Sequence, residues 1–248
     1  MMFEPDKMLI LQGEDIVIND FITLHQPNVG QITSFGEQKF FSIFHSLCGI
    51  PSDMKSILDD NGIDYMKITD WELFLSLCRM YKKEDTSLIF GDLDFSKGEM
   101  FVDKETGKTV LVLEQGVVTE DMYLQFIPFV REMVGYTVKR EKAANKFTKK
   151  ILIDEDRQKR EQAKNKKYES FLYSIVLSLV NTEEFKYNYQ TVFDCTIYQL
   201  TKSYLQIQNK KSACALYQGS MSGFVDTSKI NKSNFSWVYS EDKFNNTK

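Results

Sequence analysis

Residues Lys139–Lys167 read KREKAANKFTKKILIDEDRQKREQAKNKK, a stretch without glycine or proline. The stretch holds twelve Lys or Arg and five Asp or Glu, which gives it a net charge of +7. Because the whole chain sums to −4, the residues on either side together carry −11. Beyond Asp154 the stretch has no apolar residue larger than alanine, so a helix there would be polar on all sides. The sequence predicts a basic connecting helix between two acidic regions.

The composition is typical of a folded protein that is mostly helical. Of the 248 residues, 42 % are hydrophobic, 13 % are aromatic and four are proline, which leaves room for long helices. We expect an α+β fold that is predominantly α-helical, with an N-terminal hairpin, a central hairpin and a C-terminal helical hairpin. The predicted organisation is an N-terminal α+β domain (1–138), the basic helix (139–167), a C-terminal helical domain (168–239) and a disordered tail (240–248).

Local patterns give the elements of the N-terminal domain. Met8–Leu11 and Ile16–Ile18 are β-prone runs around a polar turn and predict a hairpin. Ser34 and Glu37 have the spacing of a capping box, as do Thr69 and Glu72. Gly62 is expected to end the helix after Pro51 in a left-handed conformation.

The second half of that domain predicts more strands. Ser87–Phe95 is interpreted as a strand with a glycine turn. Glu99–Val102 and Lys108–Glu114 are predicted to form the central hairpin, with Gly116–Val118 as its extension. Thr119 is expected to cap the helix that follows.

The sequence does not predict an enzyme. The four cysteines are far apart and are expected to be buried thiols. His45 is expected on a helix face and His25 in a loop, and neither has a second histidine at metal-ligand spacing. Asp92 and Asp94 are interpreted as turn residues, with Leu93 and Phe95 buried between and after them. We assign no catalytic residue, no cofactor and no metal, and find no phosphate-binding loop.

The basic stretch and a tyrosine cluster are the candidate interaction surfaces. The stretch is a solvated helix that meets an acidic surface of the same or another chain, a flexible linker, or a contact for phosphates. Phe185, Tyr187 and Tyr189 either close the core or form a protein-binding patch. The candidate partner-binding residues are Lys146, Lys149, Lys150, Arg157, Arg160, Tyr187 and Tyr189.

Several blocks of the chain resemble a family of proteins encoded in tail-gene modules of phages that infect Firmicutes. The blocks are QPNVGQITSFGEQKFF (26–41), PSDMKSILDDNGIDYMKITDWELF (51–74), EDTSLIFGDLDFSK (84–97), EKAANKFTKKILIDEDR (141–157) and NTEEFKYNYQTVFDCTIYQL (181–200), and the resemblance covers residues 16–238. These proteins are similar to tail assembly chaperones. The resemblance implies a role in virion morphogenesis and carries over no functional residue.

We therefore expect a non-enzymatic interaction protein, a tail assembly chaperone that binds the tape measure or tube proteins in the host cytoplasm. A structural component of the virion, in the tail or connector, is the alternative, and a nucleic-acid-binding regulator that uses the basic segment is a further one. Nucleic acid is the less favoured partner. No window approaches the ~18 uninterrupted apolar residues of a membrane-spanning helix, so no membrane is expected. Self-association into a homo-oligomer stays open.

Overall fold

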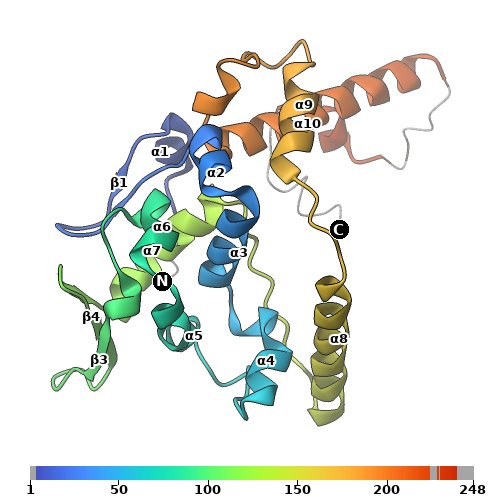
Figure 1. Ribbon diagram of the computed structural model, residues 1–248. Helices are drawn as coiled ribbons and strands as arrows, with labels where there is room; N and C mark the ends of the chain where they lie inside the picture. Colours follow the sequence, from blue (N-terminus) through green and yellow to red (C-terminus); the bar gives the residue numbers. More distant parts are fainter. Residues whose placement is uncertain (1–3, 224–227, 229, 239–248) are drawn as a thin grey trace. The chain divides into compact units, whose positions relative to one another are not determined.

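The computed structural model describes residues 4–223, 228 and 230–238, and the predicted tail, Ser240–Lys248, lies outside them. The fold is 57 % helical and carries two small antiparallel sheets, which confirms the predicted α+β class (Figure 1). The chain forms two compact units. The first comprises the described residues up to Ser170 together with Thr196–Tyr198, and the second comprises Phe171–Cys195 and the described residues from Gln199 onward.

The first unit contains most of the elements. In chain order they are α1 (Lys7–Gln12), β1 (Ile16–Val17), β2 (Thr23–Leu24), α2 (Val29–Phe35), α3 (Glu37–Cys48), η1 (Pro51–Asp53), α4 (Lys55–Asp60), α5 (Asp70–Leu77), η2 (Cys78–Met80), α6 (Lys83–Phe90), η3 (Phe95–Lys97), β3 (Glu99–Val102), β4 (Thr109–Val112), β5 (Val117–Val118), α7 (Glu120–Met133) and α8 (Lys146–Lys164). The basic helix α8 therefore belongs to the same compact unit as the helices before it.

The second unit is helical. It contains α9 (Phe171–Val180), η4 (Val192–Asp194), most of α10 (Ile197–Met221) and η6 (Lys232–Phe235). Trp237 is tied to α10, because its carbonyl accepts hydrogen bonds from Gln206 Nε2 at 2.8 Å and Asn209 Nδ2 at 2.9 Å.

An aromatic cluster forms the core of the first unit. Phe74 of α5 lies at its centre, with ring-centroid distances of 5.1 Å to Tyr123, 5.5 Å to Trp71 and 5.5 Å to Phe95. Phe90 and Phe126 extend the cluster in edge-to-face contacts. Such pairs stabilise a core beyond the area that they bury, so α5, α6 and α7 are held to one another mainly by rings.

The central hairpin is confirmed. β3 pairs with β4 in the register Glu99↔Val112, and β4 pairs in turn with β5. Asp103 shapes the connection by accepting hydrogen bonds from the backbone N–H groups of Glu105 and Thr106. The cap predicted at Thr69, the cap at Thr119 and the left-handed Gly62 are also present.

The predicted strand at Met8–Leu11 is wrong, because these residues belong to helix α1. Asp6 accepts the N–H of Met8 at 2.9 Å and caps the helix, and Gly13 ends it at φ 80°. β1 pairs with β2 instead, in the register Ile16↔Leu24. A helix of six residues is too short for its periodicity to be distinguished from that of a strand.

The predicted capping box at Ser34 and Glu37 is also wrong. The box lies at Asn28 and Gln31, where each side chain accepts the backbone N–H of the other residue. α2 therefore begins six residues earlier than expected, and Gly36, at φ 102°, separates it from α3.

Ser87–Phe90, predicted as strand, is the last turn of α6. Glu84 and Asp85 lie in the first turn of this helix, where carboxylates are favourable. Gly91 ends the helix at φ 58° and donates its N–H to Ser87. The β-prone residues are thus the end of a helix that begins just before them. The strand prediction started at Ser87 and so did not include the beginning of this helix.

Asp70 joins three elements of the first unit. As the first residue of α5, its carboxylate accepts a hydrogen bond from Arg131 of α7 at 3.1 Å. Arg140 donates to both of its oxygens, at 2.9 and 2.8 Å. The side chains of Asp70 and Arg131 are almost entirely buried, so this pair is desolvated and sensitive to loss of either partner.

The substitution Asp70→Asn should lower the free energy of unfolding by about 3 kcal/mol, because it leaves the buried Arg131 guanidinium without a counter-charge. Urea unfolding followed by circular dichroism measures the loss. Asp20→Asn is the control, since Asp20 is exposed and makes no ion pair within the described residues. Equal effects of the two substitutions would contradict the proposed importance of Asp70.

Candidate interaction surfaces

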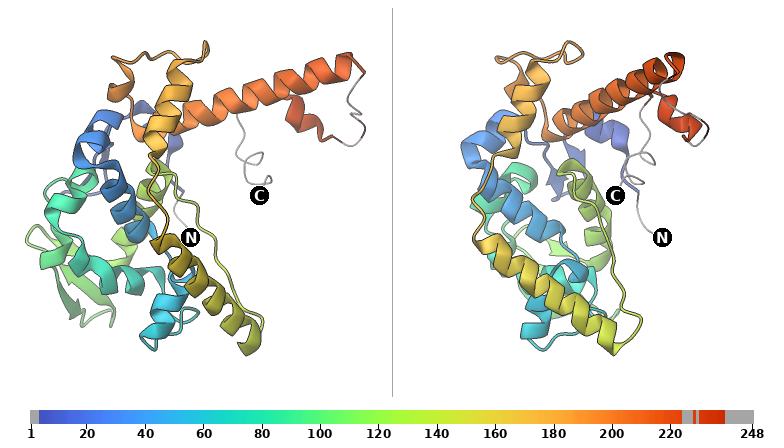
Figure 2. Two further views of the ribbon diagram at one scale, coloured as in Figure 1. Left: turned by 45° about the vertical axis from the view of Figure 1, so that its right-hand side comes forward. Right: turned by 90° about the vertical axis from the view of Figure 1, so that its right-hand side faces the viewer.

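The basic helix α8 packs along the short helix α4 (Figure 2). α4 is six residues long and ends with Asp59 and Asp60, and Asp64 follows in the next turn. The C-terminal end of a helix already carries partial negative charge, so the two carboxylates concentrate negative potential there. We call Asp59, Asp60 and Asp64, with the apolar side chains of Leu58, Tyr65 and Leu73 beside them, the acidic seat.

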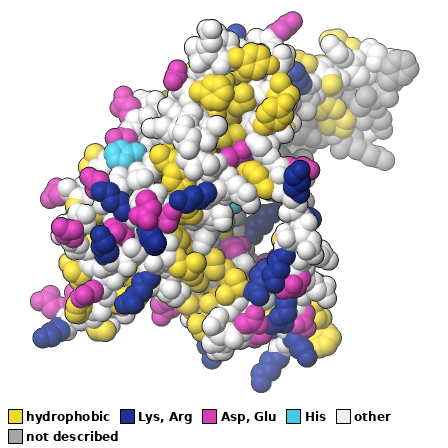
Figure 3. Space-filling view, viewed as in Figure 1, with side chains coloured by type: hydrophobic (Ala, Val, Ile, Leu, Met, Phe, Trp, Pro, Cys, Tyr) yellow, Lys and Arg dark blue, Asp and Glu magenta, His cyan; other side chains and the backbone are white. Residues whose placement is uncertain are grey.

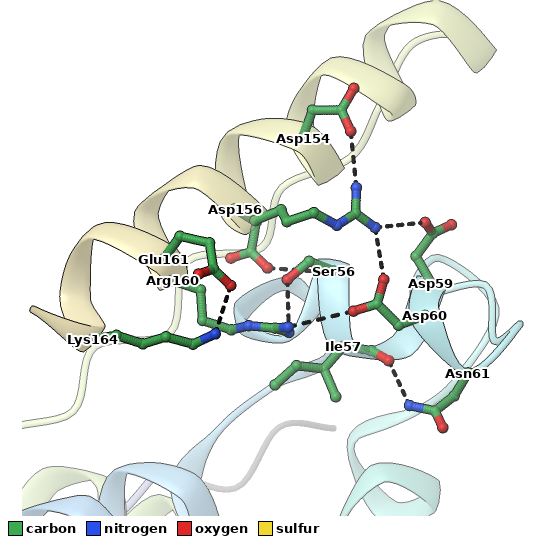
Figure 4. A network of polar contacts seen from close by, with 11 residues as sticks. Ser56, Ile57, Asp59, Asp60, Asn61, Asp154, Asp156, Arg160, Glu161 and Lys164 are labelled. Atoms are coloured by element: carbon green, nitrogen blue, oxygen red, sulfur yellow. Dashed lines mark hydrogen bonds and ion pairs between the residues drawn. The ribbon is translucent and has the colours of Figure 1, made fainter.

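Two arginines of α8 neutralise the end of α4. Arg157 Nη2 lies 2.8 Å from Asp60 Oδ1 and 3.2 Å from Asp59 Oδ2. Arg160 donates to Ser56 Oγ at 3.2 Å and lies 3.4 Å from Asp60 Oδ2. Figure 4 shows Arg160 reaching from α8 toward Asp60 and Ser56.

A carboxylate of α8 caps the N-terminal end of α4. Met54, at the N-cap of α4, makes no side-chain cap hydrogen bond. Asp156 Oδ2 instead accepts the N–H of the buried Ser56 at 2.9 Å (Figure 4). One face of α8 thus presents an anion to the positive end of α4 and cations to its negative end.

One apolar side chain fixes α8 in place. Among the nineteen residues of α8, Ile153 is the buried one, with 6 % of its surface exposed. It packs against Leu58, Tyr65 and Leu73. Burial of an isoleucine side chain stabilises by roughly 1.5–3 kcal/mol, so this contact rivals the sum of the exposed ion pairs at ~0–1 kcal/mol each.

Further ion pairs join parts of the basic stretch to the rest of the first unit. Lys149 lies 2.7 Å from Asp64, and Lys55 lies 2.7 Å from Glu141. Of the predicted partner-binding residues, Lys149, Arg157 and Arg160 therefore have partners inside this chain. Lys146 and Lys150 are exposed and make no ion pair within the described residues.

The ion pairs lower the pKa values of the carboxylates. The hydrogen bond from Arg157 is the main cause of the lowered pKa of Asp60. The hydrogen bond from Lys149 is the main cause at Asp64. Both groups stay ionised at neutral pH, so the seat keeps its charge.

The second unit has a different surface, formed by α9. Leu172, Ile175 and Leu179 form its buried face. Phe171 is 44 % exposed, and Tyr173 and Leu177 are 69 % and 43 % exposed. Hydrophobic side chains gather over the region where Figure 1 places α9 (Figure 3). Ser174 and Ser178 are exposed as well, so the exposed side of α9 combines apolar and hydroxyl side chains.

The predicted tyrosine cluster lies after α9. The rings of Phe185 and Tyr187 are 5.4 Å apart, and Asn181 donates to Tyr189 Oη at 2.9 Å. Tyr187 and Tyr189 both keep exposed surface. They stay candidates for partner binding, beside the exposed residues of α9 that the sequence did not single out.

The remaining candidates for chemistry have structural roles. Asp94 caps η3 by accepting the N–H of Ser96, and Asp92 lies 2.7 Å from Lys83. Leu93 and Phe95 are buried as predicted. Within residues 4–223, 228 and 230–238, no group of three or more His, Cys, Asp or Glu side chains is arranged to hold a metal ion.

Three cysteines are buried as predicted, whereas Cys214 is exposed. Burial raises the pKa of the Cys48 thiol to about 12 and that of Cys195 to about 11. Thiols with such pKa values are poor nucleophiles at neutral pH. None of the helices in the described chain is long and apolar enough to cross a membrane.

Comparison with known proteins gives one match. Residues 163–240 match the model of a family described as the YomV second domain, which is about a third of the chain. Over this range the chain is similar to a phage-associated protein family. The range begins near the end of α8 and covers α9 and α10. No curated protein and no solved structure matches the chain.

The substitution Ile153→Ala should release α8 from the acidic seat. Loss of the buried side chain costs ~2 kcal/mol or more, which corresponds to roughly 30-fold faster amide hydrogen exchange in α8. Ile151→Ala is the matched control, because Ile151 is 42 % exposed. Equal exchange rates in the two variants would show that Ile153 does not hold the helix.

Acid should release α8 before the core unfolds. Because the pKa values of Asp60 and Asp64 are lowered in the folded state, their contribution is complete above about pH 5 and is lost as the pH falls through the lowered values. Amide exchange, corrected for intrinsic rates, should show α8 losing protection at a higher pH than α7. Simultaneous loss in both helices would contradict this order.

Proposed function

We propose that this protein is a non-enzymatic interaction protein of phage tail morphogenesis, which binds the tape measure or tube proteins during assembly. The observation that carries the proposal is the exposed apolar face of α9, in the unit that the phage-associated family matches. Large exposed apolar side chains on one helix are typical of a protein–protein interaction site.

The chemistry of α9 suits a helical partner. Its ten residues are FLYSIVLSLV, in which two serines are the polar residues. Tyr173 and Leu177 are one helical turn apart and share a face. An amphipathic helix of the tape measure protein, which is otherwise exposed until the tube forms around it, would cover these side chains in a helix-to-helix contact.

The basic stretch contributes less to this proposal than its charge suggests. Arg157 and Arg160 are engaged with Asp59 and Asp60, so an acidic partner or a phosphate would have to compete for them. We therefore place the partner-binding surface on the second unit, with Tyr187 and Tyr189 as its extension.

Co-expression with the tape measure protein of the same tail module tests the proposal. The chain should increase the soluble fraction of the tape measure protein, and Tyr173→Asp with Leu177→Asp should remove the increase, since charge is costly in an apolar interface. Met80→Asp, at an exposed apolar residue of the first unit, is the control. A tape measure protein that stays equally insoluble with and without this chain would refute the assignment.

Mass spectrometry of purified particles separates the chaperone from the structural alternative. A chaperone should be absent from mature tails, whereas a tail or connector component should be present in stoichiometric amounts.

A further inference from the structure

The acidic seat recognises a helix through one face. On α8 the contacting residues are Lys149, Ile153, Arg157 and Arg160. Their spacings of four, four and three residues place them on one side of a helix. Each meets a complementary group of the seat: Lys149 meets Asp64, Ile153 meets Leu58, and the two arginines meet Asp60.

The links on both sides of α8 have neither helix nor strand. The preceding segment is pinned as far as Glu141, which pairs with Lys55. Residues 142–145 then connect to α8, and residues 165–170 follow it. Four extended residues span at most ~14 Å, and the link after α8 is held at Ser170, which donates to Glu37 at 2.5 Å, so α8 can leave the seat within the reach of these two links.

Apart from the burial of Ile153, the forces that hold α8 are individually weak. The carboxylates and guanidinium groups at the seat are about half exposed, and exposed ion pairs contribute little and are screened by salt. In one chain, the short link raises the effective concentration of α8 at the seat. At high protein concentration, an identical helix from another molecule competes with it.

We propose that the acidic seat is a docking site for α8 of a second copy of this chain, so that two molecules exchange α8 reciprocally. Exchange of an identical element makes a two-fold symmetric dimer that uses contacts already present in one chain. The charge complementarity at Asp64 and Asp60, together with the apolar contact of Ile153, selects this occupant. The inference does not depend on the proposed function.

Two charge-reversal variants test the exchange. Asp59→Lys with Asp60→Lys makes a basic seat, and Arg157→Glu with Arg160→Glu makes an acidic face on α8. In either variant alone, like charges meet and α8 should leave its own seat. In an equimolar mixture, each α8 finds a complementary seat on the other molecule.

The mixture should form a heterodimer of twice the monomer mass at low salt, while each variant alone stays monomeric in analytical ultracentrifugation. The variant with all four substitutions restores the pairing within one chain, and it is the control for folding of the reversed seat. A mixture that stays monomeric, with the fourfold variant folded, would overturn the proposal.

A second measurement uses the wild-type chain. Light and ¹⁵N-labelled protein are mixed at high concentration and treated with a carbodiimide, which links Lys149 to Asp64 without a spacer. Exchange predicts cross-linked peptides that carry one light and one heavy partner, and these should decrease at high salt. Links between equally labelled peptides alone would exclude the exchange, even where the reversed variants fail to fold.

Discussion

The short helix α4 has no side-chain cap at its N-terminal end and carries two carboxylates at its C-terminal end. A helix of six residues leaves most of its N–H and C=O groups without internal partners, and α4 concentrates two carboxylates where its dipole is already negative. Helix α8 supplies partners at both ends. Asp156 accepts the N–H of the buried Ser56, and Arg157 and Arg160 pair with Asp60. Ion pairs therefore couple two segments of the chain, from Glu37 to Asp70 and from Arg140 to Lys164.

This coupling changes how the net charge of +7 on Lys139–Lys167 is interpreted. A basic stretch in an acidic protein is commonly taken as a site for an acidic partner, yet four of its twelve cations, Arg140, Lys149, Arg157 and Arg160, already pair with carboxylates between Asp59 and Asp70. The other cations, Lys146 and Lys150 among them, are exposed. Exposed charges are screened at physiological salt, so we propose that specific recognition depends more on the apolar side chains of α9.

The sequence predicted the fold class and those elements whose signals are local. The caps at Thr69 and Thr119, the turn at Gly62 and the hairpin of β3 and β4 each depend on a few adjacent residues. Helices α1 and α6 were missed because each is too short for the apolar period to be distinguished from that of a strand. The pairing of α8 with α4 could not be predicted, because Asp60 and Arg157 are distant in the chain and surface charges fit many partners. The candidate cations were therefore chosen by charge alone, and three of them pair with the chain's own carboxylates.

Helices α8 and α9 follow one another and have opposite surfaces. Along α8 one apolar side chain is buried, and the other contacts with the seat are polar. Along α9 nearly every side chain is apolar, yet one face is buried and the other is exposed. The exposed side of α9 carries Tyr173 and Leu177 together with the serines Ser174 and Ser178. Charge can be matched within one chain at little cost, whereas exposed apolar area of this kind is stabilised by burial against another molecule. The two helices thus have different roles: α8 packs against α4 through ion pairs and Ile153, and we propose that α9 presents apolar side chains to a partner.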